Sequence, residues 1–186
     1  MFTSIRNISH IQAWYFLKTE PDGVAVYLQA KHFDEYGDIK KDALNADLRH
    51  DLQERHLLQE NDVIFVGKWV RTFAWAYKSQ YGPCVASSAF FIIRIHYEIV
   101  LPEYLALLLN KAEYMPDLKK HYSWSTVPSI SKHILSDLEI PIPPIEKQKI
   151  MIKLAELHKK ASSLRSEIQS KQNLLVSHSI LLASHL

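Results

Sequence analysis

The chain has 186 residues, a formal charge of only +2, 47% hydrophobic residues and a single cysteine. These values are typical of a globular protein with one domain, or one domain and an appendage. They exclude a disulfide scaffold, because Cys84 has no partner, and the four widely separated glycines exclude a P-loop and a Rossmann fingerprint.

The first third of the chain predicts one strand and one short helix. Val24–Gln29 is an apolar run directly after a Pro-Asp-Gly turn, which indicates a strand. Residues 33–41 contain Gly37 and many charges, so we expect a loop. Leucines recur at near-helical spacing within the polar residues 43–59, which predicts a short helix or helical turn.

The middle of the chain predicts strands followed by short helices. Val63–Val66, Phe73–Tyr77 and Ala89–Ile95 are short runs rich in β-branched and aromatic residues, as in strands. A proline precedes a predicted helix over residues 103–111, and Ser131 is a candidate N-cap for a helix that ends at Asp137. This mixed order predicts an α+β globular domain over residues 1–140.

A stiff connector and one long helix follow. Residues 141–144 read Pro-Ile-Pro-Pro, which favours an extended connector, and residues 145–186 contain neither glycine nor proline. Apolar residues there alternate in steps of four and three, which is a coiled-coil heptad pattern broken only by Lys171 and His178. The apolar positions of this seam are Ile150, Leu154, Leu157, Ala161, Leu164, Ile168, Leu175 and Leu182.

The length of this helix predicts a partner helix. About 40 residues of α-helix extend roughly 60 Å, and a domain of about 140 residues cannot cover one whole face of such a helix. We therefore expect residues 145–186 to form a coiled coil and to act as a dimerisation helix.

The near-neutral total charge conceals an uneven distribution. Residues 1–62 contain 11 acidic and 7 basic side chains, whereas residues 141–186 contain 3 acidic and 7 basic ones. Val63 to Tyr97 contains no acidic residue, while lysines and arginines alternate there with nine aromatic residues. Such a stretch suits a phosphate backbone, although aromatic strands with a few solvated cations would look the same.

Six segments, in order along the chain, resemble one known family. The most specific are VPSIS at Val127–Ser131 and LEIPIPPIEKQKI at Leu138–Ile150, ahead of the heptad helix. Weaker similarities are GVAVYLQ, NDVIFV, CVASSAF and YLALLLN, which begin at residues 23, 61, 84 and 104. Together they resemble a target recognition domain of the specificity subunits of type I restriction–modification systems. Asn61 stands where that family usually has glycine, and Lys147 stands where it usually has glutamate.

The resemblance implies a recognition protein without catalysis or cofactor. Specificity subunits of this family bind double-stranded DNA and dock a methyltransferase subunit and, through it, a restriction subunit. A full subunit has two recognition domains and two long antiparallel helices, whereas this chain has one of each. Either the chain is a fragment, or it forms a homodimer through its long helix and reads an inverted repeat.

DNA reading requires cations for phosphates and polar or aromatic side chains for base edges. The candidate phosphate contacts are Lys68, Arg71, Lys78, Lys119 and Lys120. The candidate base-edge or stacking contacts are Trp69, Tyr81, His121, Tyr122, Ser123, Trp124 and Ser125.

Two alternatives remain open. The chain could be a coiled-coil adaptor or decoy that binds the methyltransferase without reading DNA, in keeping with its low net charge. It could also be a Mg²⁺-dependent nuclease that uses Asp22, Asp38 and Lys40, although an acid-x-Lys pattern often arises by chance. No secretion signal or membrane span is apparent, so we expect a cytoplasmic protein with no metal site.

Overall fold

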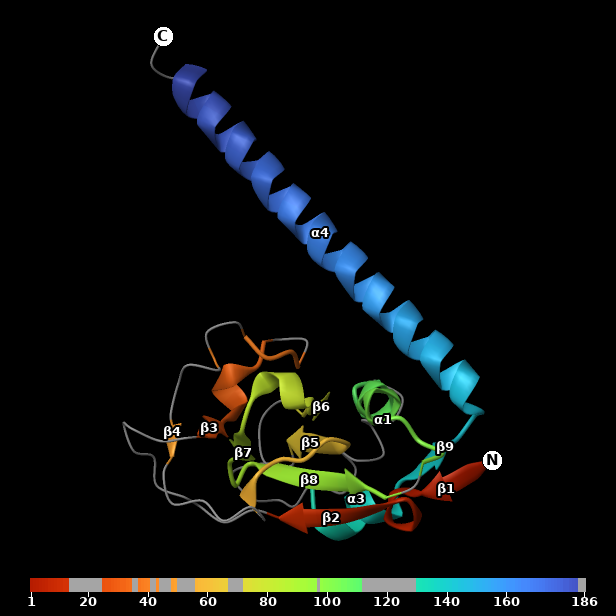
Figure 1. The fold of residues 1–186 in the computed structure, drawn as a ribbon. Helices are drawn as coiled ribbons and strands as arrows, with labels where there is room; N and C mark the ends of the chain where they lie inside the picture. Colours follow the sequence, from red (N-terminus) through yellow and green to blue (C-terminus); the bar gives the residue numbers. More distant parts are fainter. Residues whose placement is uncertain are drawn as a thin grey trace. The chain divides into compact units, whose positions relative to one another are not determined.

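A computed structural model describes residues 1–13, 25–34, 37–40, 43, 48–49, 56–66, 72–96, 98–111 and 130–183. The chain divides into two compact units, Met1–Gln148 and Lys149–Leu186. The first unit contains three sheets, with strand orders β1-β9, β2-β8-β5-β6 and β4-β3-β7 among the described strands. The expected mixed architecture, a globular α+β part followed by one long helix, is confirmed (Figure 1).

The four-stranded sheet is the centre of the first unit. It consists of β2 (Ser9–Ala13), β8 (Phe90–Ile95), β5 (Asp62–Val66) and β6 (Ala74–Ala76), and every neighbouring pair is antiparallel. Apart from the register pair Asp62–Arg94, β8 and β5 are apolar on both faces, and Ile64 and its register partner Ile92 are fully buried. Helix α1 (Pro102–Leu109) packs on β5 and β6 and buries Leu105, Leu108 and Leu109 (Figure 1).

A three-stranded sheet completes the main core. It contains β4 (Leu48–Arg49), β3 (Ala25–Leu28) and β7 (Cys84–Ala86), and β3 and β7 run parallel. Its residues share one buried cluster with the four-stranded sheet, and five aromatic side chains belong to that cluster: Phe33, Phe73, Trp75, Tyr77 and Phe90. Seven of the nine aromatic residues between Val63 and Tyr97 are described, and all except the half-buried Tyr81 are buried. Most aromatic residues of the acid-free stretch therefore build the core.

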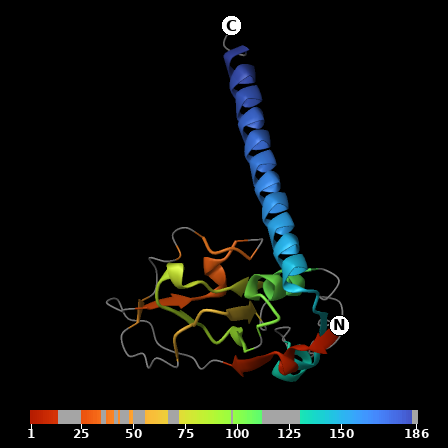
Figure 2. The same cartoon turned by 45° about the vertical axis from the view of Figure 1, so that its right-hand side comes forward.

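A two-stranded sheet joins the two ends of the first unit. β1 (Phe2–Ser4) pairs antiparallel with β9 (Glu139–Pro141), and the Ile142 N–H donates to the Met1 carbonyl oxygen at 2.8 Å. This pair lies at the end of the unit away from the β4-β3-β7 sheet (Figures 1 and 2). Helix α3 (Lys132–Asp137) precedes β9, and the Ser131 hydroxyl accepts a hydrogen bond from the Ile134 N–H, as its N-cap assignment predicts.

Two sequence expectations were wrong in detail. Leu48 and Arg49 form strand β4 instead of a helix, and Leu48 pairs with Val26. A leucine spacing of four residues also fits one face of a strand, so it could not distinguish the two structures. Pro141 belongs to β9 rather than to a free connector, because an edge strand tolerates proline. Strands β1, β2 and β9 were not predicted from the sequence.

The second unit consists of one helix. α4 spans Ile145–Ala183, so its first turn, up to Gln148, belongs to the first unit. Its 39 residues correspond to roughly 58 Å. None of the helices in the described part of the chain is long and apolar enough to cross a membrane.

Candidate nucleic-acid interface and pairing helix

The described residues include only two of the twelve candidate DNA contacts. Lys78 and Tyr81 are described and are treated below. The other ten lie outside the described residues: Lys68, Trp69, Arg71, Lys119, Lys120, His121, Tyr122, Ser123, Trp124 and Ser125. These ten lie in two segments, residues 67–71 and 112–129. The described geometry is therefore that of the residues that flank these two segments.

The flanking residues of the two segments are joined directly. Residues 67–71 connect β5 to β6, and the Val66 N–H donates to the Phe73 carbonyl oxygen at 2.9 Å. Residues 112–129 follow α1, whose C-cap is Asn110. The Asn110 side chain accepts from the Ala74 N–H at 2.9 Å and donates to the Ala74 carbonyl oxygen at 2.8 Å. A residue shortly after one candidate segment is thus hydrogen-bonded to a residue shortly before the other.

Acidic residues from outside the acid-free stretch neutralise two of its four cations. The Lys78 ammonium lies 3.0 Å from a carboxylate oxygen of Glu103 on α1. Arg94 makes two 2.8 Å hydrogen bonds to Asp62, which is fully buried. These bonds raise the pKa of Arg94, because they stabilise its charged form. The two described cations of this stretch therefore already have carboxylate partners within the fold.

Tyr81 lies on the surface of the aromatic core. Its ring centroid is 4.9 Å from that of Trp75, and it ends the 3₁₀ helix Ser79–Tyr81. Ser79 binds the Glu60 carboxylate through both its backbone N–H and its hydroxyl group. These two bonds, the hydroxyl bond first, lower the pKa of Glu60. The half-buried Tyr81 ring packs against the core and can still offer one edge to a ligand.

Two of the three residues of the nuclease alternative, Asp38 and Lys40, are described. The Lys40 ammonium donates to the Lys31 carbonyl oxygen at 2.8 Å, and the Asp38 N–H donates to the Asp34 carboxylate at 2.9 Å. Asp22 lies outside the described residues. Among the residues that the structure describes, no group of three or more His, Cys, Asp or Glu side chains could hold a metal ion. This arrangement does not favour metal-dependent cleavage.

The apolar seam of α4 is exposed along its length in this single chain. Ile150 and Leu154 are each 66% exposed, and Leu157, Leu164, Ile168 and Leu175 are between 50% and 68% exposed. Leu182 is in the helix, but its side chain is not among those described. Monomeric proteins rarely expose a continuous apolar stripe of this length, so such a stripe marks an interaction surface.

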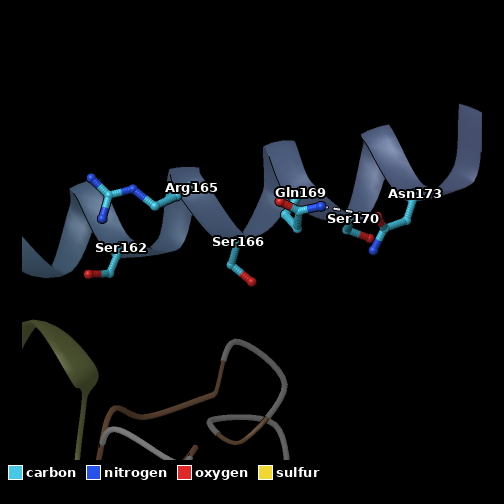
Figure 3. A pocket seen from close by; sticks show the side chains of 6 residues that line it. All are labelled: Ser162, Arg165, Ser166, Gln169, Ser170 and Asn173. Carbon is cyan, nitrogen blue, oxygen red and sulfur yellow. Dashed lines mark hydrogen bonds between the residues drawn. The ribbon is translucent and has the colours of Figure 1, made fainter.

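Another face of α4 is polar. Figure 3 shows Ser162, Arg165, Ser166, Gln169, Ser170 and Asn173 along that face, and the Gln169 amide donates to the Asn173 side-chain oxygen at 3.0 Å. Arg165 is the single charged residue in this group. In its middle third, α4 is therefore amphipathic, with a seam on one side and small polar side chains on another.

Gln148 fixes the first turn of α4. Its side chain is fully buried and accepts from the Leu101 N–H at 2.9 Å. Its amide group donates to the carbonyl oxygens of Ile99 and Pro143 at 2.7 and 2.8 Å. Gln148 stands in the motif at Leu138–Ile150, but the sequence predicted no role for it, and it predicted none for Asn110. A glutamine at the start of a helix, next to a proline run, is too common a pattern to reveal such a contact.

The chain is similar to proteins of known family. Residues 28–171 match a family model described as the type I restriction modification DNA specificity domain. No curated protein matches the chain. Solved structures similar to the chain include the HsdS subunit from Thermoanaerobacter tengcongensis, with a TM-score of 0.60 and 17% identity over 88% of this chain and 38% of that chain.

Two further structures have similar folds. The S subunit of a type I restriction-modification system from M. genitalium has a TM-score of 0.58 and 12% identity, over 86% of this chain and 39% of that chain. A structure described as the basis of complex assembly and conformational transition of the type I R-M system has a TM-score of 0.64 and 16% identity. It covers 94% of this chain and 42% of that chain. The chain thus spans about two fifths of the length of each of these three structures, and the similarity shows a shared fold.

Proposed function

The chain belongs to the family of type I restriction modification DNA specificity domains, and from this premise we propose that it is a half-size specificity subunit. In this proposal the first unit reads one DNA half-site, and α4 supplies the contact with a second copy and with a methyltransferase subunit. The restriction subunit joins through the methyltransferase, and the chain itself performs no catalysis.

The proposed DNA-reading surface consists of residues 67–71 and 112–129. Lys68, Arg71, Lys119 and Lys120 would bind phosphates, because cations neutralise the DNA backbone. The polar and aromatic residues at 121–125, together with Trp69, would reach base edges. What supports this surface is the double hydrogen bond of Asn110 to Ala74, which joins the flanks of the two segments. Lys78 would contribute less, because Glu103 already neutralises it.

The proposed pairing with a second copy rests chiefly on the exposed seam of α4. The chain covers about two fifths of the length of each of the three solved structures, so two copies related by a twofold axis would approximate one of those chains in size. Isologous pairing needs a self-complementary surface, and an unbroken apolar seam from Ile150 to Ile168 is one. A twofold dimer would read an inverted repeat.

DNA binding is tested by the salt dependence of affinity for a duplex library. We expect the affinity of the wild-type chain to fall steeply as salt rises, and Lys68→Glu with Arg71→Glu to reduce the log–log slope by about 2. Lys31→Glu with Lys132→Glu is a charge-matched control on exposed residues far in sequence from residues 67–71. Equal and weak affinity at low and high salt, unchanged by either pair, would disprove DNA reading.

That negative result would favour the adaptor alternative, provided that the chain still binds a methyltransferase subunit. The binding is measured by co-purification of the chain with the methyltransferase encoded nearest to it. A chain that binds the methyltransferase but shows no salt-dependent DNA affinity is an adaptor or decoy. A chain that binds neither contradicts the whole proposal.

A further inference from the structure

The residues that flank the seam of α4 carry information about the partner. In a two-stranded coiled coil, the positions on either side of the seam face the other helix. On one flank these positions hold Lys153, Lys160, Glu167 and Leu174, and on the other they hold Met151, His158, Arg165 and Gln172. All of them are exposed in α4 except the half-buried Met151. The second flank has no acidic residue, so in an antiparallel pair, where each flank faces its own copy, only the first can form opposite-charge pairs.

A parallel, in-register pair of α4 helices conflicts with this pattern. It would place Lys171 of each copy against Lys171 of the other within the seam, and His178 against His178. It would also place Lys160 beside Arg165 of the second copy across the flank. Like charges that face each other destabilise pairing. The sequence of α4 therefore disfavours the parallel orientation.

One antiparallel register sets no Lys or Arg against another and no Glu against another, and it covers the seam. When Ile150 lies opposite Leu175 of the second copy, Leu157 lies opposite Ile168 and Ala161 lies opposite Leu164. Lys171 then lies over Leu154, where its methylene stem can cover the leucine while its ammonium remains in water. In the same register Lys160 faces Glu167 of the second copy, and the twofold axis repeats this pair.

The two neighbouring antiparallel registers are each opposed by a charge. Sliding one helix by a heptad in one direction places Glu167 against Glu167 at the twofold axis. Sliding it in the other direction sets Lys153 against Glu167, but it also places Lys160 against Lys160 at the twofold axis and shortens the overlap by one heptad. Within its own chain, Glu167 also has a cation partner, because the Lys171 ammonium lies 2.7 Å from its carboxylate. Both side chains are more than half exposed, so this pair is weak and does not change the ranking of the three registers.

We propose that α4 pairs antiparallel with α4 of a second copy in the register that sets Lys160 against Glu167, and that this charge pair selects the register. The inference rests on the homodimer of the proposed function and makes it specific. A slip of one heptad moves the helices by about 10 Å, or roughly three base pairs of DNA. The Lys160–Glu167 pair would therefore also set the separation of the two half-sites.

Charge exchange in the full-length chain tests the inference. Lys160→Glu and Glu167→Lys each convert two attractive contacts per dimer into repulsive ones. We expect each variant alone to have a dimer dissociation constant about tenfold above that of the wild type, measured by sedimentation equilibrium at low salt. In a heterodimer of the two variants, one site keeps the wild-type contact of Lys160 with Glu167. The other site joins the two substituted residues, whose charges are exchanged but still opposite. An equimolar mixture should therefore form a heterodimer of wild-type affinity. Lys159→Glu, a neighbour that points away from the seam, is the matched control.

A disulfide reports the register independently. In the proposed register Leu157 faces Ile168 of the second copy, so an oxidised mixture of Leu157→Cys and Ile168→Cys should yield a cross-linked heterodimer. The native Cys84 is fully buried and does not interfere. A mixture of Leu157→Cys and Leu175→Cys should not cross-link, because that pair meets only in the register that opposes Glu167 to Glu167.

The outcomes separate the two levels of the proposal. A wild-type chain that sediments as a monomer overturns the homodimer and the register together. A wild-type dimer that Lys160→Glu and Glu167→Lys leave unchanged overturns the register and leaves the homodimer standing. A cross-link between the Leu157→Cys and Leu175→Cys variants also overturns the register and leaves the homodimer standing. Weakened single variants, a restored mixture and the 157–168 cross-link together support the proposal.

Discussion

Asn110 binds Ala74 through both the backbone N–H and the carbonyl oxygen of that residue, as a neighbouring strand would. The C-cap of α1 therefore extends the hydrogen bonding of β6 at the edge of the four-stranded sheet. β6 follows residues 67–71, and Asn110 precedes residues 112–129. One side chain thus links the two segments that we propose as the DNA-reading surface.

Replacing this side chain should weaken both stability and DNA binding. Asn110→Ala leaves the N–H and the carbonyl oxygen of Ala74 without their partner, and Ala74 is only 2% exposed. We expect a loss of about 2 kcal/mol in the free energy of unfolding, measured by urea denaturation. DNA affinity should fall at salt concentrations where the variant is fully folded, because the flanks of the two segments are no longer joined.

Asn110→Asp provides the control for this prediction. Aspartate keeps the acceptor for the Ala74 N–H but sets a carboxylate against the Ala74 carbonyl oxygen, so it should be at least as damaging as alanine at neutral pH. An Asn110→Ala variant with wild-type stability and wild-type affinity would show that the link is unimportant.

Gln148 should be the most sensitive residue of α4. Gln148→Leu keeps nearly the same volume but leaves the Leu101 N–H and the carbonyl oxygens of Ile99 and Pro143 without this partner. We expect the free energy of unfolding of the first unit to fall by about 3 kcal/mol, since three half-buried backbone groups lose their hydrogen bonds to a fully buried side chain. Chemical denaturation followed by tryptophan fluorescence measures this change.

Two other substitutions sharpen that test. Gln172→Leu removes an exposed glutamine from the same helix and should change stability by less than about 0.5 kcal/mol. Gln148→Glu should be destabilising at neutral pH and less so in acid, where a protonated carboxyl group can again donate to a carbonyl oxygen. Equal effects of the Gln148 and Gln172 substitutions would contradict the role of Gln148.

The sequence predicted those features that depend on local patterns. The heptad spacing predicted α4, and Ser131 predicted the start of α3, because caps and periodicity are properties of neighbouring residues. The fold of the core strands followed from apolar runs in the same way. Leu48 was misassigned because a step of four residues fits both a helix and a strand, and only its pairing with Val26 distinguishes them.

Features that depend on distant residues could not be predicted. The acid-free stretch from Val63 to Tyr97 suggested four available cations, but Glu103 and Asp62 come from outside it and neutralise Lys78 and Arg94. Asn110 reaches Ala74 across 36 residues, and no local signal reports that contact. One departure from the family pattern did have a visible reason: Asn61 replaces the usual glycine at φ +74°, and asparagine tolerates that backbone conformation.

Asp62 and Arg94 should stabilise the fold together, so that losing one partner costs more than its own contribution. Arg94→Met leaves the fully buried Asp62 carboxylate without its cation, and only the Gln59 N–H at 2.8 Å remains among its partners named here. We expect a loss of about 3 kcal/mol in the free energy of unfolding, measured by urea denaturation. The double variant Asp62→Asn with Arg94→Met removes the buried charge as well and should lose less than the sum of the two single variants. Additive losses would show that the two residues act independently.

Cys84 should make the fold sensitive to alkaline pH. Its thiol is buried in β7, and burial raises the pKa of Cys84 from its ordinary value of 9.0 to about 12. The folded state therefore holds the thiol proton more tightly than the unfolded state does. This contribution to stability is fully present below pH 9 and is lost as the pH rises from 9 toward 12. At about pH 10 the loss should already be about 1 kcal/mol.

Urea denaturation between about pH 8 and about pH 10.5 measures this loss, with Cys84→Ala as the comparison. The alanine variant should be less stable at the lower pH, because a small cavity replaces the sulfur, but its stability should decline less steeply with pH. Burial also raises the pKa of Tyr77, so a shallower alkaline decline will remain in the variant and should be reduced further by Tyr77→Phe. In the folded wild type the thiol should react with Ellman's reagent only at the rate of opening of the core, because the thiolate is scarce and covered. Rapid labelling without denaturant, or identical pH profiles for wild type and Cys84→Ala, would refute this account of Cys84.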